Sequence, residues 1–204
     1  MRSSSARGVG YRVAGSTVTV VDRACGACPP CQAGRSYWCS RPREAGPELV
    51  TVDGAGQRPV AAWLTGLSAV RAAGLPPHST VLVLSTADPT PVRELVGLVH
   101  PGPVLAIADA RDPGIRETLA ATTDNGRAPA VLALAAARSA VRAVDRGGVV
   151  CLPDAEVDPP SVTEVVQREL TVVGPRDLTR LVATSGSAAL ADALHRTVGS
   201  DGTR

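Results

Sequence analysis

The stretch that decides the fold lies near the N-terminus and reads CGACPPCQAGRSYWC, from Cys25 to Cys39. Its spacing, Cys25-x2-Cys28-x2-Cys31-x7-Cys39, lets four thiolates converge on one tetrahedral ion. An all-sulfur ligand set favours Zn²⁺ over Mg²⁺ or Ca²⁺, and the absence of a fifth nearby ligand in the run favours a closed site. The spacing therefore predicts a structural zinc held by Cys25, Cys28, Cys31 and Cys39.

Two other uses of the same cysteines stay open at this point. In an oxidising compartment they could form two disulfides, which would leave Cys151 as an unpaired fifth thiol. An iron–sulfur cluster also takes three closely spaced cysteines and a fourth, although ferredoxin runs are spaced differently. The first thirteen residues lack the apolar core of a secretory signal, so we expect a cytoplasmic protein with reduced thiols.

Residues on both sides of the cysteine run carry a family resemblance. The pieces Gly10–Gly15 (GYRVAG), Val18–Val20 (VTV) and Cys25–Cys39 resemble the structural-zinc lobe of zinc-containing medium-chain alcohol dehydrogenases. More weakly, Val60–Leu84 resembles the helix and turn that lead into the first Rossmann strand of that family, and Val166–Gly174 resembles a late strand. The resemblance implies a truncated, degenerate member of the family, which would form a homodimer or bind a partner enzyme.

Composition excludes several kinds of chemistry. All 21 basic residues are arginine, so Schiff-base, P-loop and Tyr-x3-Lys mechanisms have no lysine to use. The net charge of +2 gives no support for nucleic-acid binding, and the absence of Phe argues against base-stacking platforms. The longest fully apolar run, residues 130–137, is far shorter than the roughly 18 residues of a membrane span. We therefore predict neither a nucleic-acid partner nor a membrane partner.

Beyond the cysteines the pattern alternates between strands and helices. Apolar runs bounded by polar residues predict strands over 81–84, 104–108, 130–134, 149–152 and 170–173. Segments with helical character predict helices over 61–75, 92–99, 115–121, 138–144 and 187–198. The pattern predicts an α/β fold: a reduced, Rossmann-like, doubly wound parallel sheet with a small N-terminal structural-zinc lobe. We place the domains at 1–59 and 60–204, with 41–59 as a linker or surface loop.

The residues after the first predicted parallel strand do not suit a dinucleotide. Where the glycines of a G-x-G-x-x-G loop would stand, the sequence has Ser85, Ala87 and Thr90. The neighbouring Pro89 and Pro91 remove backbone N–H donors from the helix start, and Asp88 adds a negative charge. Ordinary NAD(P) binding is therefore doubtful.

One acidic residue keeps a place that the resemblance assigns to the cofactor. Asp109 ends the second predicted parallel strand, where the family places a carboxylate on the adenosine ribose. A helix cap or turn residue is the competing interpretation. Only about 20 residues separate it from the next strand, so we expect one βα unit of the sheet to be shortened or lost.

Catalytic residues are not apparent. The family's catalytic zinc takes two ligands upstream of the structural lobe, where this chain does not reach, and a third near Val60, where only Val and Ala are found. His78 and His100 are expected in solvated turns, and Cys151 is expected to be a small buried hydrophobe.

Two hypotheses follow, with a third as a distant option. The first is a zinc-binding alcohol dehydrogenase-like protein that has lost hydride transfer and acts by binding. The alternative is an NAD(P)-dependent oxidoreductase or repurposed pathway enzyme with a reshaped cofactor cleft. A zinc-ribbon nucleic-acid module is disfavoured by the charge.

Overall fold

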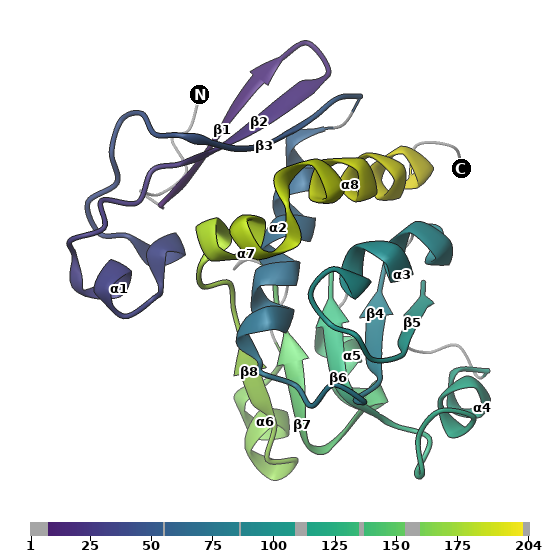
Figure 1. Cartoon of the computed structure of the whole chain (residues 1–204). Coiled ribbons are helices and arrows are strands. Elements are labelled where there is room, and N and C mark those ends of the chain that lie inside the picture. The colour runs from purple at the N-terminus through teal and green to yellow at the C-terminus, as the bar shows by residue number, and fades with distance from the viewer. Residues whose placement is uncertain are drawn as a thin grey trace.

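The computed structural model describes residues 8–54, 56–85, 87–108, 114–134, 137–153 and 160–201, which contain two sheets (Figure 1). The antiparallel sheet has the order β1-β2-β3. Its strands are β1 Val9–Ala14, β2 Thr17–Asp22 and β3 Glu48–Val52. The other sheet is parallel throughout and has the order β5-β4-β6-β7-β8. Its strands are β4 Val81–Leu84, β5 Val104–Ile107, β6 Ala128–Ala133, β7 Val144–Cys151 and β8 Thr171–Val173.

Helices connect and cover these strands. Two short ones, α1 Pro29–Gln32 and the 3₁₀ helix η1 Ser36–Trp38, lie between β2 and β3. The segment that contains them, residues 23–47, is what we call the cysteine lobe. The others are α2 Gln57–Ala72, α3 Pro89–Gly97, α4 Ile115–Ala120, α5 Ala137–Ala143, α6 Val162–Gln167, α7 Leu178–Ser185 and α8 Ser187–Asp201.

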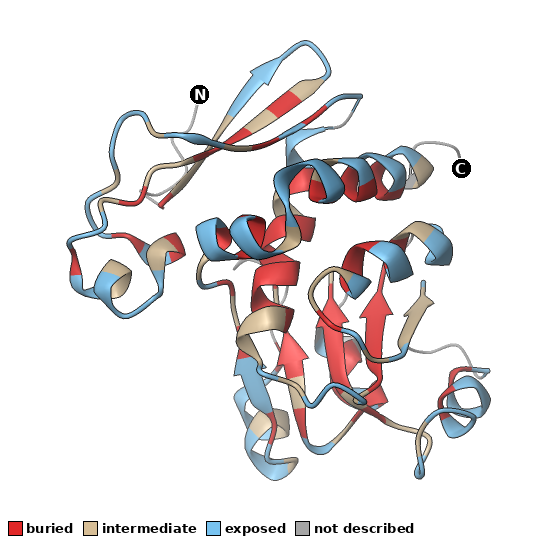
Figure 2. Cartoon of the chain, in the orientation of Figure 1, coloured by how far each residue is buried: buried red, intermediate tan, exposed pale blue. Residues whose placement is uncertain are grey.

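The parallel sheet is covered on both faces, as a doubly wound fold requires. Side chains that alternate along β4 enter two different apolar clusters, with Val81 and Val83 in one and Leu82 and Leu84 in the other. The first cluster includes residues of α2, α3, α7 and α8, and the second includes residues of α4 and α5. Figure 2 shows the resulting buried interior along β4, β6 and β7. The predicted fold class is confirmed.

Strand order bears out the expected loss of a βα unit. Across the described residues the parallel sheet has five strands, whereas the full Rossmann order has six. The chain passes from β5 through the short helix α4 directly to β6, on the other side of β4. No strand of the described residues pairs with the far side of β5, and all four of its residues are half-buried.

Helix α2 packs closely on the parallel sheet. Leu64, Leu67 and Val70, which predicted this helix from their spacing, are buried. Gly66 lies so near β6 that an added Cβ would approach Leu132 Cδ1 to 2.9 Å. A side chain at position 66 would therefore require the Leu132 and Leu134 side chains to shift.

The expected linker over 41–59 was wrong for residues 48–52, which form β3. Val50 and Val52 are buried on one face of the antiparallel sheet, while Thr51 on the other face contacts Thr19 at 3.2 Å between hydroxyl oxygens. Helix α8 covers the apolar face. The period-2 alternation in ELVTV was present in the sequence, but the surrounding Gly and Pro residues concealed it.

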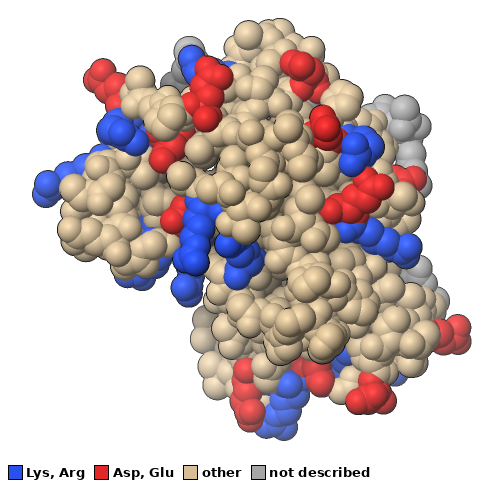
Figure 3. All heavy atoms as spheres, viewed as in Figure 1, with Lys and Arg blue, Asp and Glu red and all other residues tan. Residues whose placement is uncertain are grey.

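One face of the molecule shows no separation of positive from negative charge (Figure 3). On the face seen in Figure 3, arginine and acidic side chains are interspersed over both parts of the molecule. No helix within the described ranges is long and apolar enough to cross a membrane.

Candidate metal centre and sheet-end site

The four predicted cysteine ligands meet at one point of the cysteine lobe. The Sγ atoms of Cys25, Cys28, Cys31 and Cys39 all lie within 4.8 Å of one another. Those of Cys28 and Cys31 are 3.4 Å apart, and those of Cys28 and Cys39 are 3.8 Å apart. All five cysteines of the chain are free thiols, so no disulfide competes for these sulfurs. It is the only such group of three or more metal-binding side chains among the residues that the structure describes.

Short local elements place these sulfurs. Cys28 caps the start of α1, which begins at two prolines, and Cys31 lies inside that helix. Cys39 follows η1, and Cys25 follows the end of β2. The apolar cluster around them contains Ala24 and the cysteines themselves. The lobe therefore has little apolar surface of its own to bury.

Backbone amides already favour thiolate at two of the four positions. The N–H of Cys28 donates to Sγ of Cys25 at 3.3 Å, and the N–H groups of Ala27 and Cys28 lower the pKa of Cys25. The N–H groups of Cys31 and Ser40 lower the pKa of Cys28 to about 5. Loss of solvent raises the pKa of Cys31 to about 12. A cation at this centre would favour the thiolate form of Cys31 and displace its proton.

Two of the sulfur–sulfur separations are close to those of a zinc–thiolate tetrahedron. Zinc–thiolate bonds of about 2.3 Å in a tetrahedron place neighbouring sulfurs about 3.8 Å apart. The separations of 3.4 and 3.8 Å lie close to that value. Four sulfur ligands would fill a tetrahedral zinc and leave no open position for a reacting group.

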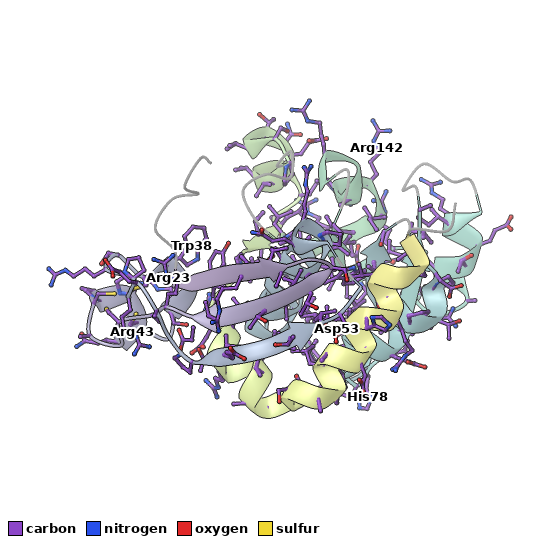
Figure 4. The ribbon with its side chains drawn as sticks, turned by 90° about the horizontal axis from the view of Figure 1, so that it is seen from above. Arg23, Trp38, Arg43, Asp53, His78 and Arg142 are labelled. Atoms are coloured by element: carbon purple, nitrogen blue, oxygen red, sulfur yellow. The ribbon has the colours of Figure 1, made fainter. Side chains whose placement is uncertain are left out.

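Two aromatic residues attach the cysteine lobe to the rest of the molecule. The indole Nε1 of Trp38 donates to the Pro175 carbonyl at 2.8 Å, and the Tyr37 N–H donates to the Arg176 carbonyl at 2.8 Å. The two rings meet edge to face with centroids 5.1 Å apart. In Figure 4, Trp38 lies at the lobe end of the molecule, near Arg23 and Arg43.

The second candidate site is the turn from β4 into α3. Ser85 is buried, and its hydroxyl oxygen accepts the N–H of Ala87 at 3.2 Å. Asp88 caps α3, and its carboxylate accepts the N–H of Thr90 at 2.8 Å. Two of the amides at this helix start are thus already bound by the protein's own side chains.

The remaining amides of this turn are absent or covered. Pro89 and Pro91 have no N–H, and the N–H of Asp88 donates to the Ser200 hydroxyl at 3.3 Å. Ser200 lies near the end of α8, and its own hydroxyl donates to the Thr197 carbonyl at 2.7 Å. Arg196 of the same helix pairs with Glu94 of α3 at 2.8 Å. Helix α8 therefore lies against the start of α3.

The other titratable candidates do not gather into a site. Cys151 is buried as expected, and burial raises its pKa to about 12. His78 is exposed, but the prediction of a solvated His100 was wrong. His100 is 3 % exposed and its Nε2 lies 2.6 Å from the Ser79 carbonyl oxygen, which makes it a structural residue. Asp109, the predicted cofactor residue, lies outside the described residues.

Sequence reasoning missed the contacts of Ser200 and Trp38. Each joins residues more than a hundred positions apart, and no local motif marks either one.

The architecture is similar to that of solved proteins, although neither a family model nor a curated relative matches the sequence itself. An NAD-dependent alcohol dehydrogenase has a TM-score of 0.54 at 16% identity, covering 90% of this chain and 71% of its own. The alcohol dehydrogenase of the archaeon Aeropyrum pernix has a TM-score of 0.54 at 15% identity, covering 91% and 71%. The chain has the fold of the medium-chain alcohol dehydrogenases.

The fold is also similar to that of an alcohol dehydrogenase solved with its cofactor, although the match does not cover that protein's full length. An alcohol dehydrogenase from E. coli, solved with NADH, has a TM-score of 0.52 at 14% identity. The match covers 87% of this chain and 66% of the E. coli protein. The chain thus spans about two thirds of that alcohol dehydrogenase. At these identities the likeness establishes the medium-chain alcohol dehydrogenase fold and nothing finer.

Proposed function

We propose that this chain is a zinc-binding protein of alcohol dehydrogenase fold that acts by binding a partner and does not transfer hydride. The observation that carries the proposal is the start of α3. Every amide between Ala87 and Pro91 is either missing or bound by Ser85, Asp88 or Ser200.

Phosphate binding at a helix start depends on free N–H groups that point at the anion. A diphosphate at α3 would have to displace the Asp88 carboxylate and the Ser200 hydroxyl, and it would meet the negative charge of Asp88. Both terms oppose binding. A nicotinamide nucleotide would therefore lose the main interaction that fixes it in a Rossmann sheet.

Zinc has a structural role in this proposal. Cys25, Cys28, Cys31 and Cys39 would hold it, and it would fix the path of the cysteine lobe without taking part in a reaction. Since the ligands must be reduced thiols, the cytoplasm remains the proposed location. We expect one zinc per chain by metal analysis of protein purified without chelator.

Calorimetric titration with NADH and with NADPH tests the loss of hydride transfer. The expected result is no saturable heat at nucleotide concentrations up to about 1 mM. This corresponds to a binding free energy less favourable than about −4 kcal/mol. Saturable binding in the micromolar range would refute the proposal. Asp109→Ala provides the matched variant, because a loss of such binding in it would assign the ribose contact to that residue.

The alternative function is an oxidoreductase with a reshaped cleft. It is favoured by the likeness to an alcohol dehydrogenase that was solved with NADH. Steady oxidation of any alcohol with added NAD or NADP, absent in Asp109→Ala, would establish it. Without turnover of alcohols, aldehydes or enones the binding role stands.

A second copy of the chain is the partner we propose. Edge strand β8 exposes 42 % of Val172, and the neighbouring helix α6 exposes 79 % of Val162 and 69 % of Val166. Pairing of β8 with its own copy would cover these side chains and satisfy the open strand edge. Light scattering should report a dimer, and Val172→Arg should shift it to monomer.

A further inference from the structure

The cysteine lobe contacts the part of the molecule built on the parallel sheet, which we call the body, through residues that lie between two of the predicted metal ligands. Tyr37 and Trp38 lie between Cys31 and Cys39, and they directly precede Cys39. Tyr37 is 3 % exposed and belongs to the main apolar core, although the cysteines belong to a separate cluster. The contact with the body therefore begins at Trp38, the residue next to the predicted ligand Cys39.

On the body side, the contact falls on the connection between β8 and α7. The carbonyls of Pro175 and Arg176 accept from Trp38 and Tyr37 at 2.8 Å each. The Arg176 N–H then donates to the Ser68 hydroxyl at 3.0 Å, and Ser68 is a buried residue of α2. The chain of contacts thus runs from Cys39 to the helix that packs on the parallel sheet.

Further contacts fix the same junction from its two sides. The Tyr37 carbonyl accepts the Gly8 N–H at 3.0 Å, which joins η1 to the segment before β1. The Thr179 hydroxyl in the first turn of α7 donates to the Asp22 carboxylate at 2.9 Å. Asp22 ends β2, directly before the cysteine lobe.

The position of Tyr37 and Trp38 in this junction depends on the arc from Cys31 to Cys39. Between the end of α1 at Gln32 and Cys39 the only regular element is η1, and the apolar cluster around the sulfurs is Ala24 with the four ligand cysteines. A metal bound at both ends of the arc would remove most of its conformational freedom, whereas a metal-free arc would retain it.

We propose that metal binding at the cysteine centre and docking of Tyr37 and Trp38 on the β8–α7 connection are coupled, so that the lobe is a metal-controlled clasp. This inference rests on the zinc site of the proposed function. With metal bound, η1 holds the connection and the first turn of α7. Without it, the clasp opens, while α8 stays in place through Leu190 and Leu194, which are fully buried.

Coupling of this kind is reciprocal, and that makes it measurable far from the sulfurs. If zinc favours docking, docking favours zinc binding by the same coupling factor, so a substitution that weakens docking should also weaken zinc binding. Ser68→Ala removes the hydroxyl that holds Arg176, and Ser68 is not part of the cysteine lobe. A lobe that binds metal independently would not respond to this change.

The test is chelator competition for zinc in the full chain and four variants. Trp38→Ala and Ser68→Ala are each expected to weaken zinc binding roughly five-fold, the size of a typical lost hydrogen bond. Trp38→Phe, which keeps a ring but lacks the indole N–H, should weaken zinc binding to a similar extent. Arg41→Ala is the matched control, because Arg41 is exposed in the same lobe, and it should leave the affinity unchanged.

Hydrogen exchange supplies the second measurement. Removal of zinc should speed exchange at the Tyr37 amide and in peptides spanning 174–180, with no change in α8. Equal zinc affinities in all five proteins, or exchange at 174–180 that is insensitive to zinc, would overturn the clasp alone. Failure of the unsubstituted protein to bind zinc would instead overturn the zinc site of the proposed function.

Discussion

The cysteine lobe and the parallel sheet are stabilised by different means. In the sheet, β4 and β6 contribute fully buried valines and leucines to two apolar clusters, so burial alone is enough to hold it. In the lobe, the buried residues around the sulfurs are Ala24, Cys28 and Cys39. The parallel sheet is therefore specified by its pattern of apolar residues, and the cysteine lobe by the spacing of its ligands. Each should therefore fail under a different perturbation.

The largest effect is expected from removing the metal centre. Cys39→Ser, or zinc removal by a chelator, should unfold the lobe, because structural zinc supplies on the order of 10 kcal/mol to domains of this kind. Hydrogen exchange should become fast over 23–47 while amides of β4 and β6 keep their protection. Retained protection in the lobe would mean that burial holds it after all.

Counting the cysteines that react with an alkylating reagent tests the same difference between the cysteine lobe and the parallel sheet. After zinc removal, iodoacetamide at pH 8 should modify four cysteines and spare Cys151, which is fully buried with a pKa of about 12. Mass spectrometry of the folded protein reads the result directly. Modification of Cys151 at a comparable rate would indicate that the sheet opens together with the lobe.

A cavity in the sheet should produce the converse pattern. Leu132→Ala removes a fully buried side chain of β6 that faces α2, and we expect a loss of about 2–5 kcal/mol in the free energy of unfolding. Zinc affinity should hardly change in folded protein. Denaturant unfolding and chelator competition measure the two quantities, and Thr51→Ala, an exposed position, serves as the control.

The smallest effect concerns the helix cap at the sheet-end site. Asp88→Ala removes the acceptor of the Thr90 N–H, and the expected loss is about 0.5–2 kcal/mol. Because the carboxylate also occupies the place of an anion, the variant should bind inorganic phosphate no worse than the parent protein. Denaturation midpoints and phosphate titration provide the comparison, and weaker phosphate binding would show that Asp88 assists anions.

The sequence predicted the parallel sheet well, because buried strands read as continuous apolar runs. Residues 81–84 form a strand with the predicted bounds, and the helix from Leu64 to Val70 lies inside α2. The spacing of the cysteines likewise predicted which sulfurs meet. In each of these cases the information is local.

The missed features have two physical causes. Helix α6 had a readable signal, since Ser161 and Glu164 form the S-x-x-E pattern and Ser161 accepts the Glu164 N–H, but the helix has only six residues and is too short for a clear period. The contacts of Ser200 with Asp88 and of Trp38 with Pro175 had no local signal. They arise only when the fold brings distant segments together.

The apolar cluster shared by both sheets has a consequence for how the chain tolerates damage. Val18 and Val52 from the first strands pack in the same cluster as Leu190 and Leu194 from the last helix. A protease that trimmed the final helix would strip the inner face of the opening hairpin, although most of the polypeptide lies between them. Residues of the antiparallel sheet and of α8 thus share one packing constraint, so a cavity made by truncation in one of them should be relieved by a larger side chain in the other.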